Sequence, residues 1–201
     1  MEKFEKHFFA LFIIFLPVLF SSCKQSSNPV AYEIANTPII TGILVTGPDS
    51  PYPLRIIGTP NEKSTLTYNG PPDNKLPHRY SIEPPYPNPA YNGTNIRFTL
   101  PVQSNISLWV VRGRAPAESP NHSAYLNGYY AVPSNRFSMK LMEGKKYAGV
   151  YTFLWDGKDQ NRETLPDGLY RIYLSVDGGG LMWRDVMIYH SLGEQNFPNI
   201  F

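Results

Sequence analysis

The stretch of sequence that decides the fold is Asn95-Ile96-Arg97-Phe98-Thr99-Leu100-Pro101. Apolar residues stand at positions 96, 98 and 100, and a polar residue precedes each of them. Because successive side chains of a β-strand point to opposite faces, this alternation predicts a strand with one buried face. Proline has no backbone N–H to donate to a sheet, so we expect the strand to end at Pro101.

The same two-residue period recurs further along the chain. It is found at residues 106–110, 151–155 and 170–176. The last of these is followed by Asp177-Gly178-Gly179-Gly180 and then by an apolar run at residues 181–190. Glycine adopts positive φ angles without steric cost, so this arrangement predicts a β-hairpin.

Helical spacing of apolar residues is interrupted throughout by glycine and proline. The chain contains 20 prolines and 15 glycines among 201 residues. Two shorter β-branched runs, at residues 39–45 and 54–57, are bounded by these residues and are further strand candidates. Short strands at near-regular spacing are typical of a β-sandwich, so we predict an all-β, antiparallel sandwich of about seven strands.

The amino terminus has the layout of a signal peptide. Residues 1–7 carry two lysines and two glutamates, and the thirteen residues from 8 to 20 are uncharged. A helix needs roughly 20 apolar residues to cross a bilayer core. A permanent transmembrane anchor is therefore the weaker alternative.

The uncharged run leads into Phe20-Ser21-Ser22-Cys23, which contains the single cysteine of the sequence. This segment resembles a bacterial lipobox, although Phe20 stands where leucine is commoner. The resemblance implies cleavage before Cys23 and acylation of its sulfur and its new amino group. Two or three acyl chains hold a protein on a membrane almost permanently. The alternative, a buried free thiol, is disfavoured by the polar residues that follow, and a single cysteine leaves no intramolecular disulfide.

The sequence divides into five predicted parts. They are a signal peptide (1–22), a tether (23–37), an extended or β segment (38–80), the main sandwich (81–192) and a tail (193–201). Whether residues 38–80 form a separate subdomain or flank the main one stays open.

Several motifs that follow one another in order resemble a known family. They are Tyr86-Pro87-Asn88-Pro89, Asn92-Gly93-Thr94 with the strand quoted above, Gly113-Arg114, Ala148-Gly149, Trp155-Asp156-Gly157-Lys158-Asp159 and Leu165-Pro166-Asp167-Gly168-Leu169-Tyr170. Together they resemble the immunoglobulin-like domain named after the flagellar hook-capping protein, over residues 86–174. Similar domains form the C-terminal modules of many secreted bacterial proteins, including sorting domains of the type IX secretion pathway. The resemblance implies an immunoglobulin-like sandwich.

The motif residues have structural interpretations. We expect Trp155 to be buried in the core, and two turns to begin at Asp156-Gly157 and at Asp167-Gly168. Tyr170 follows the second turn, where a tyrosine-corner hydrogen bond to nearby backbone is expected.

Two features depart from the family's pattern. Arg162 stands where glycine is common, which predicts either a different turn or a φ penalty of about 1 kcal/mol. The second is an insertion between Arg114 and Phe137 that carries Tyr125, Tyr129 and Tyr130. Tyrosines give contact area with little loss of side-chain entropy, so these three are candidate partner-binding residues. The alternative is that they cover a sheet edge.

Composition and motifs exclude several classes of function. The formal charge of +2, with no long basic run, argues against nucleic-acid binding. We find no nucleophile elbow, phosphate-binding loop or zinc motif, and the acidic residues fit no calcium loop. We therefore expect no catalytic residues, metal or cofactor.

The leading hypothesis is a lipid-anchored cell-envelope protein with a non-catalytic binding, assembly or scaffold role. Its expected partners are the membrane, through acyl chains on Cys23, and an envelope protein or glycan. We expect an outer-membrane lipoprotein facing the periplasm or the cell surface. A type IX-like sorting domain and an envelope enzyme acting on glycans are the alternatives.

Overall fold

The structure is a computed structural model, and it describes residues 38–71, 75–116, 138–177 and 180–190. The signal peptide, Cys23, the tether, the tyrosines at 125, 129 and 130 and the tail 193–201 lie outside these residues. Ten strands are present: β1 (Gly42–Thr46), β2 (Pro53–Gly58), β3 (Thr65–Leu66), β4 (Tyr80–Ile82), β5 (Thr94–Leu100), β6 (Ser104–Arg112), β7 (Ser138–Lys146), β8 (Gly149–Trp155), β9 (Gly168–Val176) and β10 (Gly180–Ile188).

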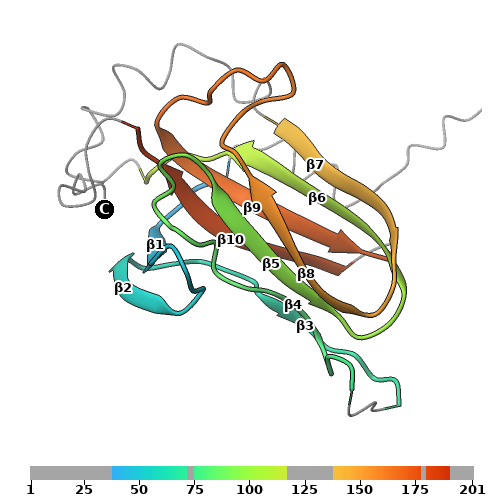
Figure 1. The fold of residues 1–201 in the computed structure, drawn as a ribbon. Helices are drawn as coiled ribbons and strands as arrows, with labels where there is room; N and C mark the ends of the chain where they lie inside the picture. Colours follow the sequence, from blue (N-terminus) through green and yellow to red (C-terminus); the bar gives the residue numbers. More distant parts are fainter. Residues whose placement is uncertain (1–37, 72–74, 117–137, 178–179, 191–201) are drawn as a thin grey trace, which may run out of the picture.

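The strands form two antiparallel sheets and one separate hairpin. One sheet has the order β10-β9-β6-β7, the other has the order β3-β4-β5-β8, and β1 pairs with β2. Figure 1 shows the two four-stranded sheets packed on each other, with the hairpin at one end. The predicted all-β antiparallel sandwich is thus confirmed.

The core lies between the two sheets and follows the predicted alternation. In β5 the side chains of Ile96, Phe98 and Leu100 are fully buried, while the residues between them are partly exposed. They meet the inward residues of β6 and β9 in one apolar cluster. Burying an aliphatic or aromatic side chain contributes about 1.5–3 kcal/mol, so these faces supply much of the driving force for folding.

The predicted hairpin of residues 170–190 is also confirmed. β9 pairs antiparallel with β10 from Gly168↔Ile188 to Val176↔Gly180. β9 is central in its sheet, because β6 lies on its other side. A strand with two neighbours is covered on both edges, and β9 is buried along nearly its whole length.

Strand β7 was not predicted. Its pairing with β6 matches Leu108 with Met142 and Trp109 with Lys140, so Leu141 is an extra residue in a β-bulge. A bulge breaks the two-residue period on which the sequence prediction rests. As an edge strand, β7 also carries lysines and a glutamate that do not resemble a buried strand.

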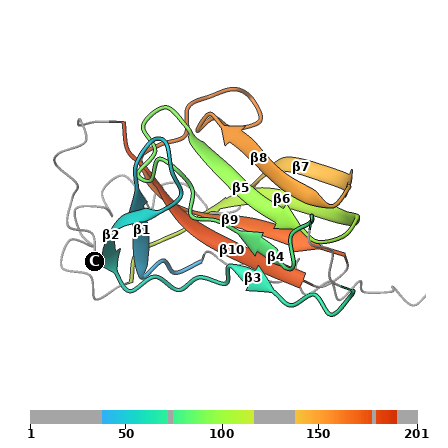
Figure 2. The same ribbon diagram turned by 60° about the horizontal axis from the view of Figure 1, so that its bottom comes forward.

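The hairpin β1–β2 packs on the outer face of the sheet that contains β9 and β10. Ile40, Ile43 and Val45 form a second apolar cluster with Leu169 of β9 and Met187 of β10. Figure 2 shows the hairpin at one end of the molecule and the segment after it running along β10 to β3.

Gly113 makes this packing possible. A Cβ on Gly113 would lie 2.3 Å from Cδ1 of Ile40, far inside van der Waals contact. The close approach is held by backbone hydrogen bonds from Ile40 N to Arg114 O and from Arg114 N to Pro38 O. Gly113 therefore lets the end of β6 receive the incoming chain.

Candidate functional site

A pair of opposite charges is buried on the outer face of β9 and β10. Arg171 and Asp185 stand opposite each other in the two strands. Arg171 Nε donates to Asp185 Oδ1 at 2.7 Å, and Nη2 donates to Oδ2 at 2.8 Å. The side chains are 8% and 0% exposed. Two parallel charge-assisted hydrogen bonds give the planar guanidinium one fixed orientation.

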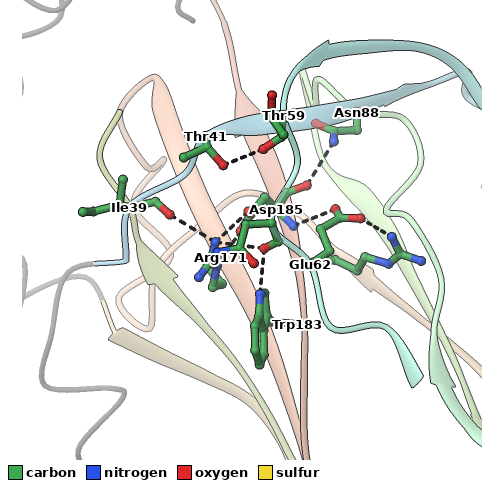
Figure 3. Close-up of polar contacts among 10 residues, drawn as sticks. Ile39, Thr41, Thr59, Glu62, Asn88, Arg171, Trp183 and Asp185 are labelled. Carbon is green, nitrogen blue, oxygen red and sulfur yellow. Dashed lines mark hydrogen bonds and ion pairs between the residues drawn. The ribbon is translucent and has the colours of Figure 1, made fainter. Parts of the chain in front are cut away.

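The same guanidinium contacts the segment that precedes the sandwich. Nη2 of Arg171 also lies 3.3 Å from the carbonyl oxygen of Ile39 and 3.4 Å from that of Asn61. Trp183 Nε1 donates to the Asn61 carbonyl as well, at 2.8 Å (Figure 3). Arg171 thus joins β9, β10 and two points of the amino-terminal segment.

A second ion pair lies beside the first. Glu62 Oε2 accepts a short hydrogen bond from Arg184 Nη1, and the two side chains are 8% and 13% exposed. Arg184 Nε donates to the carbonyl oxygen of Ile82 in β4 at 3.0 Å. Arg184 therefore links the outer segment to the edge of the opposite sheet.

Burial shifts the titration of this site. Loss of water around Asp185 raises the pKa of its carboxyl to about 6, although the hydrogen bonds and charge of Arg171 act in the opposite direction. Burial acts to lower the pKa of Arg171, but the hydrogen bonds and charge of Asp185 outweigh it and raise the pKa. Both groups are charged at pH 7, and Asp185 takes up a proton as the pH falls below about 6.

Asn88 is a fully buried polar residue at the end of the site. Its Nδ2 donates to the carbonyl oxygens of Leu44 at 2.8 Å and Asp185 at 3.1 Å, and its Oδ1 accepts from Met187 N at 3.0 Å. It also forms an isolated bridge with Thr46. The asparagine of the Tyr-Pro-Asn-Pro motif is therefore the residue that joins β1 to β10.

Three aromatic residues cross the outer face next to the ion pair. Trp109, Tyr173 and Trp183 are cross-strand neighbours in β6, β9 and β10. The rings of Trp109 and Tyr173 stack with centroids 5.5 Å apart, and those of Tyr173 and Trp183 are 6.4 Å apart. The guanidinium of Arg171 lies 5.7 Å from the Trp183 ring centroid, which adds a cation–π contact.

These contacts make the site a clamp that joins the sandwich to the segment before it. Each charge of the two ion pairs faces an opposite charge, and the guanidinium of Arg171 is further occupied by carbonyl groups. In the part of the chain that the structure describes, no three His, Cys, Asp or Glu side chains are grouped as metal ligands. The same residues include no helix that is long and apolar enough to cross a membrane. We call Arg171, Asp185, Glu62 and Arg184 the buried clamp.

Sequence reasoning missed the buried clamp. Arg171 and Asp185 occupy the polar positions of strands whose other face is apolar, which predicts exposure to solvent. The available signal was the mixture of these charges with Leu169, Tyr173 and Met187 on the same face, since apolar residues on both faces indicate a strand covered on both sides.

The motif residues named from the sequence lie in the core and in turns. Trp155 is 2% exposed and meets Tyr170 edge to face, with ring centroids 6.1 Å apart. Tyr170 Oη donates to the carbonyl oxygen of Pro166 at 2.7 Å, which is the arrangement of a tyrosine corner. Asp156 Oδ1 accepts from Lys158 N, next to Gly157 with a φ of 68°.

Two other turn positions complete this end of the sandwich. Asp167 Oδ1 accepts from His190 N at 2.8 Å just before Gly168, so it ties the start of β9 to the residues after β10. Arg162 has a φ of 68°, the left-handed region that glycine adopts without strain. Its turn is held by Asp159 Oδ1, which accepts from the backbone N–H groups of Asn161 and Glu163.

The described surface exposes large apolar side chains at two strands. Tyr52, Leu54 and Ile56, in β2 and just before it, are 80%, 75% and 61% exposed. Val150 and Leu154 in β8 are 51% and 66% exposed. A cavity of about 320 Å³ near the start of β4 is lined by Tyr68, Gly70, Pro71, Leu76, Pro77, His78 and Pro101.

Comparison with known proteins gives one short similarity. Two curated proteins, both described as "Basal-body rod modification protein FlgD", come from Salmonella typhimurium (strain LT2) and Salmonella typhi. Each is 46% identical to this chain over 37 residues, which is 18% of this chain and 16% of the relative. No family model matches the chain. No solved structure matches it. The chain spans about a sixth of the length of the curated relatives that it matches.

Proposed function

We propose that this chain is a non-catalytic binding and assembly module of a bacterial cell envelope, held at the outer membrane by acyl chains on Cys23. The signal-peptide layout and the lipobox-like segment support the anchor. The tether of residues 23–37 gives the sandwich a reach of up to about 50 Å from the lipid, at roughly 3.5 Å per extended residue.

The exposed apolar residues of β2 carry the binding part of the proposal. Tyr52, Leu54 and Ile56 are each more than half exposed, whereas Ile57 beside them packs on the clustered residues of β1. Large apolar side chains that gather on the surface of a soluble domain are typical of a protein–protein contact. Aliphatic side chains favour a protein partner over a glycan, which would require more polar groups.

The short similarity to FlgD supports an assembly role. Those relatives are described by their names as modifying the basal-body rod. The similarity covers too little of either chain to transfer that partner. It favours the general idea that the sandwich holds other envelope proteins in place.

Site-specific photocrosslinking in cells tests the proposal. A photoreactive amino acid at position 52 is expected to give a discrete adduct with an envelope protein. The adduct should disappear when Leu54→Ser and Ile56→Ser are introduced together. Because both side chains are exposed, the sandwich should stay folded in this variant.

Position 145 is the matched control, since Lys145 is exposed on β7, which does not pair with the β1–β2 hairpin. If positions 52 and 145 give the same background of adducts, β2 is not a binding surface. An adduct at position 52 that survives the double substitution would also contradict the proposal.

A further inference from the structure

Strand β8 is an edge strand without the usual protection against pairing. Among the strands that the structure describes, its only hydrogen-bonded neighbour is β5. Its sequence, Gly-Val-Tyr-Thr-Phe-Leu-Trp, contains no charged residue and no proline. Natural edge strands are commonly protected by charges, prolines or bulges, because an open edge accepts strands from other chains.

Other edges among the described strands show such protection. β2 begins with Pro53 and contains Arg55, and β7 carries lysines and a bulge at Leu141. The edge of β10 is occupied in part, because Lys63 bridges to Trp183 and Ala90 bridges to Ile188. β8 is thus the long described edge that is left open to pairing.

Hydrogen bonds on the opposite side of β5 show which backbone groups of β8 point outward. Asn95 N donates to Tyr86 O at 2.8 Å, and Tyr86 N donates to Asn95 O at 3.1 Å, so the backbone groups of Asn95 point away from β8. Asn95 pairs with Leu154. In an antiparallel ladder the bonding direction alternates from residue to residue. The N–H and C=O groups of Val150, Thr152 and Leu154 therefore face the open edge.

The order of side chains along β8 is self-complementary. A two-fold axis at Thr152 places Thr152 opposite its copy and Val150 opposite Leu154, with all three in the hydrogen-bonded positions. It also places Tyr151 opposite Phe153. Aliphatic, aromatic and threonine cross-strand pairs are each favourable, and no like charges oppose each other in this register.

The apolar core is incompletely covered along this edge. Tyr151 and Phe153 pack against the main cluster but are only partly buried. Val150 and Leu154 are more than half exposed. A second strand beside β8 would remove apolar surface from water on both faces of the sheet, which favours association.

We propose that two copies of this chain associate through antiparallel pairing of β8 with β8, about a two-fold axis at Thr152. The two β3-β4-β5-β8 sheets then become one continuous sheet. A contact of one strand pair is small compared with the roughly 1,600 Å² of a standard interface, so the dimer is weak and depends on concentration.

Sedimentation velocity of the purified full chain in detergent, over a concentration series up to about 1 mM, tests the proposal. The wild-type protein should form dimers within this range. T152K should weaken dimerisation by at least about tenfold, and so should T152E, because like charges then meet at the axis. An equimolar mixture of T152K and T152E should dimerise again through opposite charges.

The matched control is T65K, which adds the same charge at an exposed threonine of β3, at the opposite edge of the sheet, and should leave dimerisation unchanged. Equal melting temperatures of the variants show that the fold is retained. A wild-type protein that stays monomeric up to about 1 mM overturns the proposal. So does a mixture that stays monomeric while wild type dimerises, or a loss of dimers in T65K equal to that in T152K.

Discussion

At the scale of single residues, Arg171 connects both strands of the β9–β10 hairpin to the amino-terminal segment. Its guanidinium binds Asp185 through two hydrogen bonds and also reaches the carbonyl groups of Ile39 and Asn61. Removing one partner of a buried ion pair leaves the other charge without compensation, which is costlier than losing the whole pair. The stability of the fold is therefore sensitive to either member.

Arg171→Met tests this sensitivity. Methionine keeps an apolar stem of similar length but leaves the Asp185 carboxylate without its buried partner. We therefore expect a loss of about 3–5 kcal/mol in the free energy of unfolding. Urea titration at pH 7.5 measures it. Arg97→Met is the control, because the ion pair of Arg97 with Glu83 spans 3.7 Å and is partly exposed. Its loss should be about 1 kcal/mol or less. Equal losses in the two variants would contradict the assigned role.

The raised pKa of Asp185 gives a pH dependence with a definite sign. The folded pKa of about 6 lies above the unfolded value of about 3.9. The folded state therefore holds the proton more tightly, and this contribution to stability is present below about pH 4 and is lost as the pH rises through about 6.

Asp185→Asn isolates this contribution, because the amide cannot ionise. Between pH 4 and pH 6.5 we expect the stability of wild type, relative to Asp185→Asn, to fall by about 2 kcal/mol. Urea titrations of both proteins at several pH values measure the difference. If the stability of wild type relative to Asp185→Asn is constant, or grows with rising pH, the pKa of the Asp185 carboxyl is not raised in the folded state.

At the scale of elements, Asn88 connects β1 to β10. Asn88→Ala leaves the Leu44 carbonyl and the Met187 N–H without their buried partner, and each such loss costs about 1–3 kcal/mol. We expect a total loss of about 2–4 kcal/mol. In the Asn88→Ala variant, amide hydrogen exchange relative to wild type should increase more at Thr46 and Met187 than at Phe98 in the core. Asn161→Ala, in an exposed turn, should change stability by less than about 0.5 kcal/mol.

The elements also show how far the sequence predicts the structure. β5, β6, β8 and β9 were predicted from the two-residue period, which arises because one face of each meets the core. β10 was predicted as the second strand of a hairpin that begins with β9. β7 was not predicted, because the bulge at Leu141 breaks the period. β3 and β4 were not predicted, because each has three or fewer residues. The sequence did not predict the buried clamp, because its burial depends on residues 38–63, which are distant in sequence from Arg171 and Asp185.

At the scale of the whole molecule, the proposed attachment to the membrane depends on one residue, Cys23. Cys23→Ser removes the thiol that receives the first acyl chains, so we expect the variant to leave the membrane fraction. Mass measurement of the wild-type amino terminus should show acyl groups on residue 23. A wild-type terminus without added mass would contradict the lipid anchor. Cys23 lies outside the proposed sandwich, so the melting temperature of the Cys23→Ser variant should equal that of wild type.

The insertion with Tyr125, Tyr129 and Tyr130 is tested separately. Deleting residues 118–136 keeps Ala115, which is buried with the residues of β1. If these tyrosines bind a partner, the deletion should abolish a set of crosslinks that Leu54→Ser with Ile56→Ser leaves intact. A crosslinking pattern identical to wild type would leave β2 as the binding surface.

The way in which the amino-terminal segment is fastened has a mechanical consequence. If the proposed lipid anchor is present, tension applied through it reaches the described part of the fold at Pro38. There the backbone bonds with Arg114 and the side chain of Arg171 take up the load together. Tyr189, after β10, packs on the same cluster as Ile40. A force between the proposed anchor and the end of β10 is therefore carried by these contacts, and not by the sheet that contains β5 and β8.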